Sequence, residues 1–117
     1  MKEIKSKEEL KSSLDAGEKH FIVTDEKLLK ALAVRYWIQN NKVKGGLLLA
    51  ALPAAIAVGG VAAPVIGIVG AGLVVGSASI TAAQIIAVGV IIIALTAILS
   101  GQQIDSIDMT EGKIHFK

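Results

Sequence analysis

The stretch GGLLLAALPAAIAVGGVAAPVIGIVGAGLVVGSAS, residues 45–79, contains eight glycines and no charged residue. It begins a longer block, because no Asp, Glu, Lys, Arg or His occurs between Lys44 and Asp105. The 117-residue chain is 53% hydrophobic but only 3% aromatic. A domain of this size has too much surface to bury about sixty such residues in succession. We therefore interpret residues 45–101 as membrane-embedded, with an aggregating core, or a core sheltered by a partner, as the alternative.

The apolar block is long enough for two transmembrane helices. A span needs ~20 apolar residues, so residues 45–101 accommodate two spans joined by a turn. Residues 80–99 form the clearer second span. The first lies within residues 47–75, which as one helix would extend ~43 Å, beyond the ~30 Å hydrocarbon core. That segment is either one tilted helix, kinked at the glycine pair 59–60 or at Pro64, or two shorter helices.

Small residues recur every four positions in this block, a spacing that favours close helix packing. In lipid no hydrophobic effect drives helices together, so close approach of their backbones must hold them. The first ridge of small residues consists of Ala51, Ala55, Gly59, Ala63, Gly67 and Ala71, and a second consists of Gly72 and Gly76. We expect these ridges to pack against another helix, either the second span of the same chain or a copy of the chain.

The two ends of the chain are polar and predict one small α/β domain. In residues 1–44, a capping box at Ser6 begins a short helix, residues 20–23 form a strand, and an amphipathic helix follows. Residues 102–117 predict a β-hairpin that turns at residues 111–112. Because a lone hairpin is marginally stable in water, we expect it to join the strands of the N-terminal segment.

Apolar and polar residues alternate in the predicted hairpin and so define its register. Its apolar face holds Ile107, Met109, Ile114 and Phe116. In this register Met109 faces Ile114, Ile107 faces Phe116, and Asp108 faces and pairs with His115.

Basic and aromatic residues precede the apolar block and set its orientation. They are Arg35, Tyr36, Trp37, Lys42 and Lys44. Because the predicted turn between the spans, residues 77–81, carries no positive charge, the positive-inside rule places both termini in the cytoplasm. The amphipathic helix that ends near these residues either covers the core of the terminal domain or lies at the membrane surface.

The residue inventory contains no catalytic or cofactor-binding pattern. The chain has no cysteine, which excludes disulfide scaffolds, thiolate metal sites and cysteine nucleophiles. His20 and His115 are the only histidines, and two histidines without a third ligand make a poor metal site. The net charge of +2, without a basic run interleaved with aromatics, argues against nucleic-acid binding. We therefore expect no enzymatic activity and no cofactor.

The chain resembles small bacterial membrane proteins of the glycine-zipper kind. The resemblance rests on the composition and spacing of residues 51–99, between a charged N-terminus and a short polar tail. That family includes channels, holin-like and toxin-like pore formers, and simple anchors, so the resemblance implies membrane permeabilisation or anchoring. The acidic residues Asp105, Asp108 and Glu111 depart from the strongly basic tail of holins, which puts a holin in doubt.

These features predict a membrane α-helical hairpin of two transmembrane helices, with a small α/β cytoplasmic domain formed from both termini, in the bacterial inner membrane. We expect a homo-oligomeric pore or channel that permeabilises the membrane, with a weakly polar lining of Thr81, Gln84, Val88 and Ile91. Alternatively, Gln84 hydrogen-bonds across the hairpin. The rival function is a membrane anchor or scaffold whose cytoplasmic domain binds a protein. The expected partners are the lipid bilayer, further copies of the chain and that protein.

Overall fold

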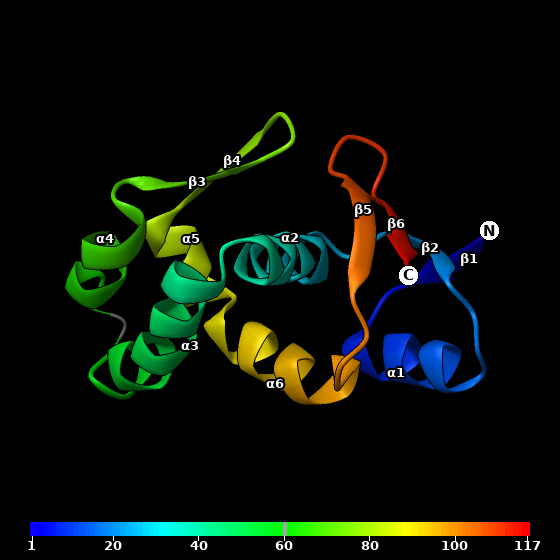
Figure 1. Ribbon diagram of the computed structural model, residues 1–117, viewed down its shortest axis with the longest axis horizontal. Coiled ribbons are helices and arrows are strands. Elements are labelled where there is room, and N and C mark those ends of the chain that lie inside the picture. The colour runs from blue at the N-terminus through cyan, green and yellow to red at the C-terminus, as the bar shows by residue number, and fades with distance from the viewer. Residues whose placement is uncertain (60) are drawn as a thin grey trace.

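Helices and strands alternate along the chain, and the computed structural model describes residues 1–59 and 61–117. The elements are β1 (Lys2–Ile4), α1 (Lys7–Asp15), β2 (His20–Val23), α2 (Glu26–Asn40), α3 (Lys42–Ala57), α4 (Ala63–Val69), β3 (Gly72–Val75), β4 (Ala78–Thr81), α5 (Ala82–Ala87), α6 (Gly89–Leu99), β5 (Ile104–Asp108) and β6 (Lys113–Phe116). A four-stranded sheet and α1 lie at one end of the molecule. Helices α3, α4 and α5 and the β3–β4 hairpin lie at the other (Figure 1).

Helix α2 is the central element of the fold. Its first turn is capped by Asp25, whose carboxylate accepts a hydrogen bond of 2.8 Å from the Leu28 amide. It packs against α3, α5 and α6 and also against strands β2, β3 and β5. Partners on so many sides bury more than one face of the helix, and its buried residues are Leu28, Ala31, Leu32, Ala33, Val34 and Ile38. Helix α2 therefore connects the two ends of the molecule through one core.

The four-stranded sheet is assembled from both ends of the chain, in the order β1-β2-β6-β5. Strands β1 and β2 are parallel and are joined through α1, whereas β6 runs antiparallel to both of its neighbours. Alternate side chains point to one face of a strand, and the buried ones here are Ile4, Phe21, Val23, Ile104, Ile114 and Phe116. The rings of Phe21 and Phe116 meet edge to face with centroids 5.8 Å apart.

The C-terminal hairpin has a longer turn than the sequence pattern predicts. Asp108 pairs with Lys113 and Ile107 with Ile114, so the predicted pairing of Met109 with Ile114 is wrong. The side chain of Asp108 accepts hydrogen bonds from the amides of Thr110 (2.9 Å) and Glu111 (3.2 Å). Asp side chains commonly stabilise turns in this way, whereas the alternation of apolar and polar residues assigns Asp108 to a strand pair.

The apolar block folds into short helices and a hairpin, and the predicted pair of transmembrane helices is wrong. Its longest helix, α3, has 16 residues and extends ~24 Å, less than the ~30 Å hydrocarbon core of a bilayer. Within the described residues, no helix combines the length and the apolar character that crossing a bilayer requires. The predicted inner-membrane pore or channel, and the membrane anchor offered as its rival, depended on those spans and are corrected with them.

Local chain breaks explain why the block does not form two long helices. Helix α3 ends at Ala57 before Gly59, whose φ of +85° is left-handed, and α4 begins near Pro64. The predicted kink residue Gly60 lies outside the described residues. The predicted second span, residues 80–99, is divided among β4, α5 and α6, because Thr81 ends a strand and caps the helix that follows it.

One hydrophobic core extends through the whole molecule. Its residues come from the sheet, from α1 and α2, and from α3, α4, β3, β4, α5 and α6. The radius of gyration of 13.4 Å agrees with the ~13 Å expected for a compact chain of this length. The molecule is longest in the direction from the four-stranded sheet to α3 and α4, and its extents are 38 × 26 × 24 Å.

Candidate functional site

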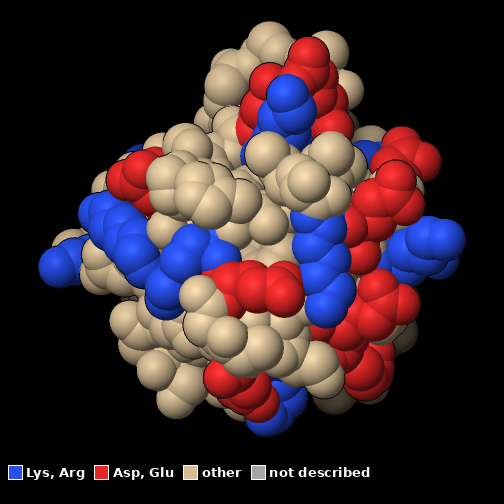
Figure 2. Space-filling model, turned by 90° about the vertical axis from the view of Figure 1, so that its right-hand side faces the viewer, with Lys and Arg blue, Asp and Glu red and all other residues tan. Residues whose placement is uncertain are grey.

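The two ends of the molecule differ in the charge of their surfaces. Figure 2 shows Lys, Arg, Asp and Glu side chains interspersed over the end that carries the sheet and α1. The ion pairs of the described residues all join groups within residues 2–30 or 105–115. The other end carries α4, α5, the β3–β4 hairpin and most of α3, all drawn from residues 45–101, which contain no charged residue. We call it the uncharged end.

Large hydrophobic side chains are exposed mainly in and beside this uncharged end. Among the described residues, all but Met1 of the exposed large hydrophobics fall between positions 43 and 93, namely Val43, Leu47, Val58, Val61, Ile66, Val74, Val90 and Ile93. Single exposed hydrophobics are normal on any protein, whereas a group of them in a region without charge is typical of an interaction surface. The uncharged end is therefore the candidate functional site.

Helix α3 presents the most regular part of this surface. Its inner face, with Leu48, Leu52 and Ala55, is buried in the core. On its outer side, exposed residues recur at helical spacing and form a stripe that we call the outer stripe, namely Val43, Leu47, Ala50, Ala54 and Val58. The exposed fractions of Val43, Leu47 and Val58 are 80%, 55% and 64%. The middle of the stripe is alanine, so another helix can approach its backbone closely.

The small-residue ridge expected from the sequence does not lie on one straight helix. The structure places Ala51 and Ala55 in α3, Ala63 and Gly67 in α4, Gly72 in β3, and Gly59, Ala71 and Gly76 in connecting turns. Ala55 alone of these is buried, and Gly67 is exposed, with no heavy atom within 4 Å of the position that a methyl group would take there. Their role in packing between chains stays a prediction.

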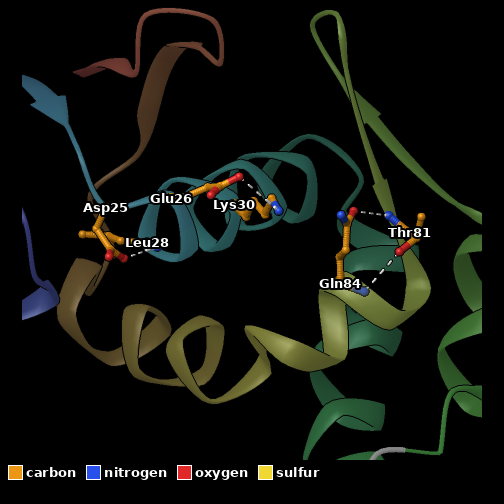
Figure 3. A network of polar contacts seen from close by, with 6 residues as sticks. All are labelled: Asp25, Glu26, Leu28, Lys30, Thr81 and Gln84. Atoms are coloured by element: carbon orange, nitrogen blue, oxygen red, sulfur yellow. Dashed lines mark hydrogen bonds and ion pairs between the residues drawn. The ribbon is translucent and has the colours of Figure 1, made fainter.

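The residues expected to line a pore have local structural contacts instead. Thr81 and Gln84 form a reciprocal cap at the start of α5, with hydrogen bonds of 3.0 and 3.2 Å between side chains and backbone (Figure 3). Val88 is buried between α5 and α6. Ile91 is half-buried on α6 and lines a hollow beside Ser6 and Leu28. The predicted pore is therefore wrong, because no helix among the described residues is long and apolar enough to form a span.

The residues expected at a membrane interface separate into three groups. Arg35 and Lys42 line one hollow beside the start of α3. Burial lowers the pKa of the Arg35 guanidinium, and its Nε–H is buried without a hydrogen-bond partner in the described part of the chain. The carbonyls of Tyr36 and Trp37 accept hydrogen bonds from Asn side chains that end α2. Lys44 is exposed.

The two histidines meet on the exposed face of the sheet. His20 and His115 are cross-strand partners, with ring centroids 3.9 Å apart. The carboxylate 3.9 Å from His115 Nδ1 belongs to Asp105, so the predicted pairing of this histidine with Asp108 is wrong. The described residues contain no cluster of three or more metal-ligating side chains.

Sequence reasoning missed the outer stripe, although its spacing can be read from the sequence. Positions 43, 47, 50, 54 and 58 follow one side of a helix, but every neighbouring position in the block is also apolar or small, so no contrast marks the stripe. Comparisons with protein-family models, with curated proteins and with solved structures find no match to this chain. The candidate site therefore depends on its geometry and chemistry alone.

Proposed function

We propose that the protein functions as a self-associating module, in which copies of the chain assemble through the uncharged end, centred on the outer stripe of α3. The observation that carries this proposal is that nearly all exposed large hydrophobics of the described residues lie between positions 43 and 93. Covering them with another apolar surface removes them from water at about 25 cal/mol per Å².

A second copy of the chain is the partner that best fits the charge of this surface. Two uncharged ends can meet without burying an unpaired charge, which is costly. If two α3 helices pack antiparallel, Lys42 and Lys44 of one copy lie far from those of the other. The two helix dipoles then point in opposite directions, which is electrostatically favourable. Ala50 and Ala54 then lie near the two-fold axis, where small side chains allow close contact.

A stable dimer sets a minimum area for this surface. A standard interface takes about 800 Å² from each partner, roughly an eighth of the 5974 Å² surface of this molecule. The exposed large hydrophobics Val61 and Ile66, which follow the outer stripe in the sequence, are also available to the interface.

Sedimentation equilibrium of the purified full chain tests this proposal over a range of protein concentrations. We expect a mass of at least twice 12.1 kDa for the wild type. Leu47→Glu places a charge in the outer stripe without disturbing the core, and should shift the mass to that of the monomer at the same concentrations. The matched control is Ser12→Glu, which adds the same charge on the exposed side of α1 and should leave the mass unchanged.

Two results would contradict self-association through this surface. One is a wild type that stays monomeric at every concentration. The other is an oligomer whose mass Leu47→Glu does not change while circular dichroism shows both proteins folded. In the second case the chain associates through another surface, and the uncharged end is not the interface.

A further inference from the structure

Helices α3 and α6 form a groove beside the outer stripe. They meet where Gly89, at the start of α6, lies against Leu52 and Ile56, near the end of α3. Along the groove a hollow of about 290 Å³ is lined by Leu49, Pro53, Ile93, Thr96 and Ala97. Apart from the Thr96 hydroxyl, which donates a hydrogen bond to the Ile92 carbonyl at 3.0 Å, these side chains are apolar.

A second hollow of about 290 Å³ continues the groove toward α2. It is lined by Arg35, Ile38, Gln39, Lys42, Gly46, Leu49, Gly101 and Gln103. Leu49 lines both hollows, so they meet at this side chain. On α3 the lining residues Lys42, Gly46, Leu49 and Pro53 follow one side of the helix over ~16 Å. The groove is therefore continuous, with a basic end and an apolar end.

The basic end carries positive charge without a neighbouring carboxylate among the described residues that line it. None of the described residues that line it is acidic, and two, Arg35 and Lys42, are basic. The buried Arg35 Nε–H lacks a hydrogen-bond acceptor among the described residues, and an unpaired buried donor is costly. The carboxamide of Gln39, which also lines this end, does not supply the acceptor and exchanges hydrogen bonds of 2.8 and 2.9 Å with the backbone of Ile104.

We infer that this groove binds a single-chain amphipathic carboxylate, with the carboxylate at Arg35 and Lys42 and the hydrocarbon chain along Leu49, Pro53, Ile93 and Ala97. A carboxylate accepts two parallel hydrogen bonds from a guanidinium, which matches Arg35 better than it would match a second lysine. The two hollows together fall within the ~300–1,000 Å³ typical of small-molecule sites, which are mostly apolar with few polar groups. The inference does not depend on the self-association proposed above, although Ile93 belongs to both surfaces.

Isothermal titration of the full chain with dodecanoate, below the concentration at which it forms micelles, tests this site. We expect saturable binding with one ligand per chain. Dodecanol has the same chain without the charge and should bind at least tenfold more weakly, and butanoate, the head group with little chain, should give no measurable heat. Vesicles of phosphatidylglycerol provide a bilayer arm, because they offer anionic head groups and acyl chains without a free carboxylate.

Variants locate the two halves of the ligand. Arg35→Met keeps the apolar stem of the side chain and should weaken dodecanoate binding at least tenfold with little effect on dodecanol. Lys27→Met is its control, since it removes an exposed cation of the same helix outside the groove. Ala97→Phe fills the apolar hollow and should weaken both ligands, whereas Ala87→Phe, at an exposed position of α5 outside the groove, should weaken neither.

Several outcomes would overturn the assignment. Folded wild type that shows no saturable binding of dodecanoate contradicts it directly. Equal binding of dodecanol, unaffected by Arg35→Met, would mean that the groove is only an apolar surface. Binding to the vesicles without binding to dodecanoate would mean that the occupant is a bilayer and not a single chain. Loss of binding in Leu47→Glu, with Arg35→Met unchanged, would place the ligand in the association surface instead.

Discussion

The sheet end and the uncharged end of this molecule share one core but use different surfaces. At the sheet end, strands alternate buried residues such as Phe21 and Ile114 with polar ones such as His20 and Lys113. At the uncharged end, the exposed positions are Ala, Gly, Pro, Ser and Thr, together with a few Val, Ile and Leu. The difference shows that a chain can bury a long apolar segment by giving its exposed positions to small residues in place of charged ones.

The ion pairs of the sheet end do not explain the stability of the fold. Their side chains are largely exposed, so solvent screens these pairs and each contributes little to stability. The hydrogen bond between Lys113 and Glu111 raises the pKa of Lys113, but both groups lie in solvent at the turn of the hairpin. Burial in the shared core is the larger effect at both ends, and this predicts that the two ends unfold together.

Substitutions that create a cavity in the core, at either end of the molecule, should lower the free energy of unfolding the most. Phe21→Ala at the sheet end and Leu52→Ala at the uncharged end each remove a side chain with no solvent exposure. We expect losses of about 3–5 and 2–5 kcal/mol in the free energy of unfolding. Urea titrations followed by Trp37 fluorescence and by far-ultraviolet circular dichroism should give one coincident transition for both variants.

Two separate transitions would contradict a shared core. In that case the sheet and the uncharged end would be independent units, and α2 would not couple them. The control is Leu47→Ala, on the outer stripe, which should change the unfolding free energy by less than about 0.5 kcal/mol in the dissociated monomer.

The junction where α3 leaves α2 should have an intermediate effect. A methyl group at Gly45 would lie 2.6 Å from the carbonyl oxygen of Ile38, and backbone atoms cannot easily move away. We expect Gly45→Ala to lower the unfolding free energy by about 1–3 kcal/mol, as overpacking does. Gly46→Ala is the matched control, since nothing lies within 4 Å of its methyl position, and alanine should there stabilise the helix by about 0.5–1 kcal/mol. If both substitutions stabilise the protein, α2 and α3 do not pack as closely as this contact requires.

Removing the helix caps should have the smallest effects on the free energy of unfolding. The two removals should also differ in how much of the fold they destabilise. Asp25 caps α2 and Thr81 caps α5 (Figure 3). We expect Asp25→Ala and Thr81→Ala each to cost about 0.5–2 kcal/mol. Because α2 contacts both ends, Asp25→Ala should speed amide hydrogen exchange throughout the core, whereas Thr81→Ala should speed it mainly in α5. Equal and global effects of the two variants would mean that α5 is as central to the fold as α2.

Local features of the sequence predicted many of the elements outside the apolar block. The cap at Ser6 and the strand at 20–23 are each set by groups within a few residues of one another, and the structure has them there. The hairpin register was predicted less well, because alternation fits two registers and the Asp108 turn chooses between them. Of the candidate site, the sequence revealed its lack of charge but not which apolar positions are exposed.

By itself, the sequence determined which segments avoid charge and, in residues 1–44, where the first helix begins and where the strand at residues 20–23 lies. These properties depend on side-chain chemistry and on hydrogen bonds between near neighbours. Only the tertiary structure decided that residues 45–101 fold back on α2 in short pieces, since that depends on partners distant in the chain. Two examples are the hydrogen bond between the Gln39 side chain and the Ile104 backbone, and the close contact of Gly45 with Ile38. Hydropathy alone cannot distinguish burial against lipid from burial against the protein itself, because both environments are apolar.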